Sequence, residues 1–226
     1  STPMTLPSRL PCLAALACVA LPVVAAEAPA ADIRNPALEV QWATPDTRPP
    51  PFDKVLLAPV ELAFRDVRPM TGPAGSTQGR NEFPVAEDDR ARLEADANRI
   101  FREELADSRR VTLVDAAGPG VLVVRPALRD IVSRMPPEEP PGRSAVFLDE
   151  VGEATLVVEF VDGATGRVLG SATDRRVAEP AGSMGGFGSV RGNTVGVTND
   201  VRRVLRRWGT RLTSRVEQLY FEAKPR

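Results

Sequence analysis

Two strand-like segments joined by a turn restrict the fold of this chain more than any other feature. Residues 153–162 alternate apolar and polar side chains, so their apolar members share one face: Ala154, Leu156, Val158 and Phe160. The turn residues Asp162-Gly163-Ala164-Thr165-Gly166 follow, and residues 167–177 form a second strand-like run. The segment therefore predicts an antiparallel hairpin whose apolar face needs a core to cover it.

The first half of the chain has the pattern of a parallel unit. An apolar run at 54–64 predicts a strand, and Asp88 or Asp89 can cap a helix that continues to about Ser108. The apolar residues of that helix recur every three or four positions: Leu93, Ala97, Ile100, Phe101 and Leu105. A short apolar strand at 111–115 follows, so strand, crossover helix and strand together predict parallel pairing.

A further strand and a long helix complete the expected domain. In the strand at 121–131, Pro126 indicates an edge position or a bulge, because proline cannot donate to a neighbouring strand. Asn199 or Thr198 can cap the final helix. Its apolar stripe consists of Val201, Val204, Leu205, Trp208, Leu212, Val216 and Leu219.

Together these segments predict a single α+β domain at 53–222. We expect a mixed sheet of about five strands covered by two helices, in the order β-α-β-β-β-β-α, with a short tail at 223–226. Residues 27–52 precede the domain and are rich in alanine and proline, which favours a flexible arm because proline fixes φ and lacks a donor. The alternative is an arm that packs on the domain through Trp42 and Phe52.

Residues 1–26 have the pattern of a cleavable secretory signal peptide behind a short N-terminal extension. Arg9 precedes an apolar stretch from Leu10 to Val24, and small residues then allow cleavage between Ala26 and Glu27. The stretch is too short to cross a bilayer, so we expect a soluble periplasmic protein. The alternative is an outer-membrane lipoprotein anchored through Cys18. Both cysteines lie in the leader, which leaves the mature chain without thiols.

Composition excludes several kinds of chemistry. The formal net charge is −1, which disfavours nucleic acid as a partner. The chain has no histidine, so it has neither an imidazole metal ligand nor a Ser-His-Asp triad. We therefore expect no cofactor, no metal and no catalytic residue, although Asp149, Glu150 and Glu153 could divide general acid and base roles.

Two regions offer candidate interaction sites. A glycine-rich loop at 182–192 carries Met184, Phe187 and Arg191, and apolar side chains on such loops mark contact points. Asp174, Arg175 and Arg176 end the hairpin and include a charge pair that could brace the neighbouring loop. Trp208 lies on the final helix. The final helix is rich in arginine, which could steer an acidic partner or anionic lipid; the alternative is a solvated helix face with self-complementary charge.

Several of these motifs resemble an uncharacterised bacterial envelope family, the domain of unknown function family numbered 3313. The likeness is carried by the runs Gly118-Pro119-Gly120-Val121-Leu122 and Gly152-Glu153-Ala154-Thr155-Leu156, by Thr165-Gly166-Arg167-Val168-Leu169 and Asp174-Arg175-Arg176, and by the tryptophan-bearing helix. The resemblance covers about residues 50–220. It implies an envelope location and a small α/β domain, commonly on a lipoprotein, with no established reaction.

These observations favour an exported, non-catalytic envelope protein that binds another protein or an envelope component. Membrane association is possible but not required, and the oligomeric state is open. The first alternative is a carboxylate-dependent hydrolase of an envelope polysaccharide that uses Asp149, Glu150 or Glu153. The second is a carrier of a small apolar ligand, which needs a cavity of at least roughly 300 Å³ between sheet and helices.

Overall fold

The long strand β5 (Val121–Ser133) is the centre of the sheet. The structure is a computed structural model, and it describes residues 38–44, 47, 49–67, 82–135, 147–148, 151–178, 190–191 and 194–223. Strand β7 (Gly152–Asp162) pairs antiparallel with one side of β5. Strands β2 (Lys54–Leu57) and β3 (Glu61–Phe64) pair parallel with the other side, one after the other.

Three more strands extend this arrangement at its two edges. Strand β8 (Val168–Ala178) pairs antiparallel with β7, and β1 (Val40–Trp42) pairs antiparallel with β8. Strand β4 (Thr112–Leu113) lies parallel to β2 at the opposite edge. The part of the chain that the structure describes therefore forms a seven-stranded mixed sheet rather than one of about five strands. The predicted hairpin and the predicted parallel unit are both confirmed.

The edge position or bulge predicted for Pro126 is wrong. The residue lies within central β5, opposite Val158 of β7, and the irregularity of that pairing falls later, between Arg129 and Val132. On the other side of β5, the predicted strand at 54–64 divides into β2 and β3. Since β2 pairs as far as Val124 and β3 begins opposite Ala127, Pro126 faces the gap between them. Pro126 has no paired residue in β2 or β3, so its missing donor is not required on that side, which explains how a central strand accommodates a proline.

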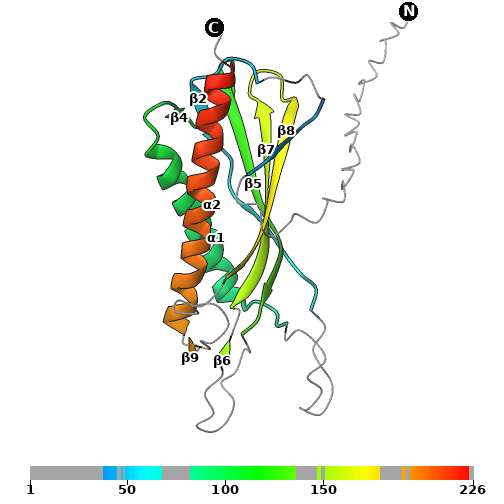
Figure 1. The fold of residues 1–226 in the computed structure, drawn as a ribbon, viewed down its shortest axis with the longest axis vertical. Coiled ribbons are helices and arrows are strands. Elements are labelled where there is room, and N and C mark those ends of the chain that lie inside the picture. Colours follow the sequence, from blue (N-terminus) through cyan, green and yellow to red (C-terminus); the bar gives the residue numbers. More distant parts are fainter. Residues whose placement is uncertain are drawn as a thin grey trace, which may run out of the picture.

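The helices α1 (Glu87–Ala106) and α2 (Thr194–Ala223) lie side by side on one face of the sheet (Figure 1). Both predicted caps are wrong. Ala86 precedes α1 without a side-chain cap, and Asp88 and Asp89 lie in its first turn, where their charge favours the helix dipole. Helix α2 begins at Thr194, so Thr198 and Asn199 lie inside it rather than in front of it.

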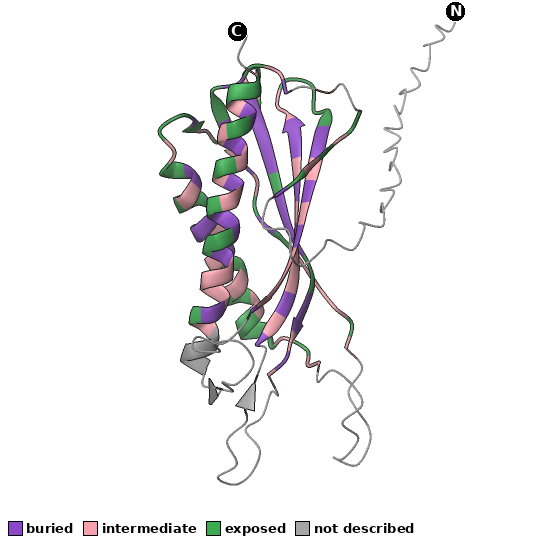
Figure 2. Cartoon of the chain, viewed as in Figure 1, coloured by how far each residue is buried: buried purple, intermediate pink, exposed green. Residues whose placement is uncertain are grey.

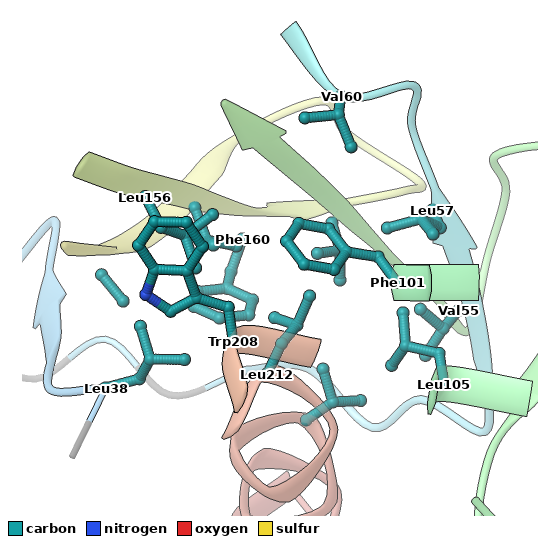
Figure 3. Packing of buried hydrophobic residues seen from close by; sticks show 14 of the residues in the cluster. Leu38, Val55, Leu57, Val60, Phe101, Leu105, Leu156, Phe160, Trp208 and Leu212 are labelled. Carbon is teal, nitrogen blue, oxygen red and sulfur yellow. The ribbon is translucent and has the colours of Figure 1, made fainter. Parts of the chain in front are cut away.

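The core lies between the sheet and the two helices. Buried residues occupy the strands and the sheet-facing sides of both helices (Figure 2). Trp208 of α2 lies beside Leu156 and Phe160 of β7, and Phe101 of α1 points into the same cluster (Figure 3). The apolar stripes predicted for the helices are the ones that reach this core: Ala97, Ile100, Phe101 and Leu105 from α1, and Leu205, Trp208, Leu212, Val216 and Leu219 from α2.

Part of the segment before β2 packs on the domain. Leu38 and Phe52 are buried in the core, and Trp42 ends β1 at the sheet edge. This part corresponds to the packed arm that we considered as the alternative to a flexible one. Residues 27–37 lie outside the described residues.

A second, two-stranded sheet pairs the backbones of β6 (Phe147–Leu148) and β9 (Val190–Arg191).

Candidate functional site

A cavity of about 330 Å³ lies between the two helices and one end of the sheet. Its walls come from the N-terminal halves of α1 and α2, from the C-terminal ends of β5 and β8, and from the beginning of β7. These five elements meet here because α1 and α2 both begin at the end of the sheet where β5 and β8 finish. The volume is at the lower end of the roughly 300–1,000 Å³ that is typical of small-molecule sites.

Most of the cavity wall is apolar. Leu128 and Ile131 contribute from β5, Val204 and Leu205 from α2, and Leu93 from α1. The indole of Trp208, which is 2% exposed, closes the inner end against the core. Such a wall releases water at little cost and favours an apolar occupant.

Beside this inner end, Asp174 and Trp208 form a buried polar contact. The Trp208 Nε1–H donates to Asp174 Oδ2 over 2.9 Å. The same carboxylate accepts from Arg176 Nε over 2.8 Å and from Arg211 Nη1 over 3.4 Å. Two guanidinium groups therefore share one carboxylate, and the indole is fixed in one orientation.

Glu153 is held by arginines on the opposite face of the sheet. Its side chain is 2% exposed and accepts from Arg65 over 3.3 Å, from Arg134 over 3.2 Å and from Arg175. Arg65 and Arg134 also bind Glu82, at 2.8 Å and 3.3 Å. The cluster ties β7 and β8 to the segments after β3 and β5, so its first role is to hold this end of the sheet together.

The carboxylates of Glu153 and Asp96 have pKa values below their ordinary range. Burial raises the pKa of Glu153, but the hydrogen bond and charge of Arg175, together with Arg65, outweigh it and lower the pKa. Burial likewise raises the pKa of Asp96, and hydrogen bonds from Arg202 and Arg99 outweigh it and lower the pKa. A carboxyl group of this kind stays ionised at neutral pH and is a poor general acid.

The candidate residues from the sequence are distributed unevenly over the structure. Asp174 and Trp208 come together, while Arg175 lies on the other face of the sheet with Glu153. Met184, Phe187, Asp149, Glu150, Ala26 and Glu27 lie outside the described residues, and of Arg191 only the backbone in β9 is described. The sequence named a cavity between sheet and helices only as what the carrier alternative needs, and it did not place Arg176 on the wall of one. The signal for Arg176 was its spacing of two from Asp174 along a strand, which puts both on one face.

Two further findings apply only to the described part of the chain. It contains no cluster of three or more cysteine, histidine, aspartate or glutamate residues that could hold a metal ion. Neither helix described there has a long enough apolar stretch to cross a membrane.

The fold and the cavity define a small α+β domain in which two helices cover one face of a mixed sheet. The chain belongs to the family described as protein of unknown function (DUF3313), whose model matches residues 28–212. This confirms the family resemblance seen in the sequence motifs. Comparison with curated proteins finds no match.

Among solved structures, similarity is broad in coverage and low in identity. The protein XCC0632 from Xanthomonas campestris, of family DUF330, is 15% identical, with 81% of this chain and 94% of that chain covered and a TM-score of 0.40. The PelC dodecamer from Paraburkholderia phytofirmans gives 17% identity, coverage of 75% and 97%, and a TM-score of 0.33. The hypothetical protein CT253 from Chlamydia trachomatis is 12% identical, with 75% of this chain and 91% of that chain covered and a TM-score of 0.32.

Proposed function

We propose that this protein is an exported, non-catalytic binding protein of the bacterial envelope, and that its cavity holds a small, mainly apolar ligand. The cavity is the observation that carries the proposal, because it has the size and the apolar wall that a ligand carrier of this kind requires. The export signal at residues 1–26 supports the location. The protein is periplasmic in this proposal, and anchoring through Cys18 is its alternative.

The chemistry of the cavity favours binding over hydrolysis. A retaining or inverting glycosidase needs one carboxylic acid that is protonated at working pH. Glu153 is the described member of the candidate set Asp149, Glu150 and Glu153, and its arginine partners lower its pKa. It therefore serves better as a fixed charge within an ion-pair cluster than as a proton donor.

Trp208 provides a direct test, because it lies on the cavity wall. The chain has two tryptophans, so Trp42→Phe leaves Trp208 as the single reporter. Titration of this variant with 1-decanol should give a saturable change in Trp208 emission. Filling the cavity with Ala154→Phe from β7, or with Val201→Phe from α2, should abolish that change.

The matched control is Ala164→Phe, which adds the same ring at an exposed position in the β7–β8 turn. It should leave the titration unchanged. Thermal unfolding of each variant shows whether it is folded before binding is measured. The proposal fails if the single-tryptophan protein gives no saturable response, or if both folded cavity-filling variants bind as well as the control.

A further inference from the structure

We infer that the ligand of this cavity is an anionic amphiphile, whose charged group lies at Arg176 and whose apolar part lies against Leu128, Leu205 and Trp208. This inference rests on the proposed function and adds the chemical class of the ligand. It is carried by the position of Arg176, by the arrangement of charges around the cavity and by the apolar wall beside them.

Arg176 is a fixed cation on the cavity wall. Its Nε donates to Asp174 Oδ2 over 2.8 Å, and its side chain is 20% exposed, so the guanidinium has a defined orientation. Among the described residues, its two terminal nitrogens have no acceptor. A planar guanidinium held through Nε presents those two nitrogens to a carboxylate or a phosphate in the geometry that such groups accept.

The wall carries excess positive charge beside Arg176. Asp174 is the single carboxylate between Arg176 and Arg211, so among these described groups one positive charge is not balanced. A negatively charged group at Arg176 would therefore enter a positive field.

The acidic residues on the cavity wall do not oppose this. Asp96 is paired with Arg99 over 2.9 Å and with Arg202 over 2.8 Å, and Asp89 is paired with Arg92 over 3.2 Å. The carboxylate of Glu153, whose backbone borders the cavity, lies on the other face of the sheet with its own arginines. Each of these carboxylates has a guanidinium partner, so their repulsion of a ligand anion is screened by a near opposite charge.

The ligand should have an apolar part because Arg176 lies next to the apolar inner end of the cavity. Trp208 donates to the same carboxylate as Arg176, so the cation and the apolar inner end of the cavity are adjacent. An anion bound at Arg176 can thus place an attached chain directly against the indole and against Leu205. A molecule without such a chain would leave this wall in contact with water.

A matched pair of probes separates charge from burial. Sodium decanoate and 1-decanol have chains of the same length, and at pH 7.5 decanoate is ionised. Burial alone favours decanol, because a carboxylate costs more to remove from water than a hydroxyl group. With Trp42→Phe as the starting protein, we expect decanoate to bind about tenfold more tightly than decanol, a difference that one charge-assisted contact can supply.

The variant Arg176→Gln should remove this preference and leave decanol affinity within about twofold. The control Arg206→Gln removes an exposed arginine from the same helix as Trp208 and should keep the preference. Arg176→Lys keeps the charge but loses the planar guanidinium, so it should retain part of the preference for decanoate. It gives a second measurement if the glutamine variant is unfolded. Inorganic phosphate, which has a charge and no chain, should not bind at the same concentrations.

The outcomes distinguish the inference from the proposed function. If neither decanol nor decanoate alters Trp208 emission, the proposed function fails. If both bind and decanol binds as tightly as decanoate or more so, the cavity is an apolar site and the anionic class is wrong. If decanoate is preferred but folded Arg176→Gln keeps the preference, Arg176 is not the site of the charge.

Discussion

Glu153 shows how a single residue can join several segments that are distant in sequence. Its carboxylate is buried and binds arginines from the segment after β3, the segment after β5 and strand β8. Removing one member of such a buried ion cluster leaves charge without compensation, and the cost is larger than that of an exposed pair. The stability of this end of the sheet should therefore depend on the ionisation of Glu153.

We predict that Glu153→Gln lowers the free energy of unfolding at pH 7 by about 2–4 kcal/mol. The pKa of Glu153 in the folded protein lies below its ordinary value of 4.5, so its contribution is complete above that value. The contribution is lost as the pH falls through the folded pKa. Urea unfolding of both proteins between pH 7 and pH 3 should give curves that converge in acid.

The matched control for this prediction is Glu61→Gln. Glu61 pairs with Arg129 over 3.3 Å and its side chain is 76% exposed, so the change should cost less than about 1 kcal/mol. A difference between wild type and Glu153→Gln that stays constant down to pH 3 would contradict the ionisation argument.

Single residues also show what a sequence can and cannot predict. The pairing of Asp174 with Arg176 follows from alternation along a strand, and a structural charge pair was expected at that place. The contact of Asp174 with Trp208 joins residues 34 positions apart, and no local pattern specifies it. The position of Pro126 was misjudged because its acceptability depends on a gap between two other strands.

At the level of elements, the contact between the helices depends on Gly209. A Cβ at this position of α2 would lie 2.8 Å from Glu104 Cγ and 3.1 Å from Glu104 Cβ of α1. Glu104 has little freedom to move away, because its Oε2 accepts from the Thr210 hydroxyl over 2.8 Å. The glycine therefore permits an approach that a larger residue would prevent.

We predict that Gly209→Val lowers the free energy of unfolding by about 2–4 kcal/mol, because the helices must separate or repack. Gly209→Ala should cost less, since alanine favours a helix by about 1 kcal/mol over glycine and offsets part of the clash. Urea denaturation at pH 7 measures both changes. The control Ser214→Val, at an exposed position of the same helix, should change stability by no more than about 0.5 kcal/mol.

The elements themselves were largely predictable from periodicity. Both helices, the β7–β8 hairpin and the parallel relation of β2 and β4 follow from spacing and turn residues. The helix starts were less accurate, because α1 begins at Glu87 and the preceding Ala86 provides no side-chain cap. The extra strand β1 has three residues, which is too short for a periodic signal, and its partner is far away in the sequence.

At the scale of the whole molecule, family membership and the α+β fold are established, and the route of the chain out of the cell remains our proposal. The cavity could not be predicted, because it results from the relative placement of five elements rather than from a motif. From the sequence we could state only the minimum cavity volume that a small-ligand carrier would need.

We predict that the protein expressed in a bacterial host that processes its leader has Glu27 as its first residue and is released with the periplasmic fraction. Intact-mass measurement of the purified protein checks this. Cys18→Ser should change neither the mass of the mature protein nor its location. A mature chain that begins at Cys18 with attached acyl groups would instead support the lipoprotein alternative.

The pairing of β1 with β8 has a consequence for the order of folding. Val40 lies opposite Ala172, so the sheet edge closes a loop of more than half of the chain. Closing a long loop is slow because its entropy is lost before the contact is formed, and three residues give few hydrogen bonds in return. The strand β1 should therefore join a sheet that already exists. A newly made chain would acquire its helix-covered core first and its N-terminal edge last.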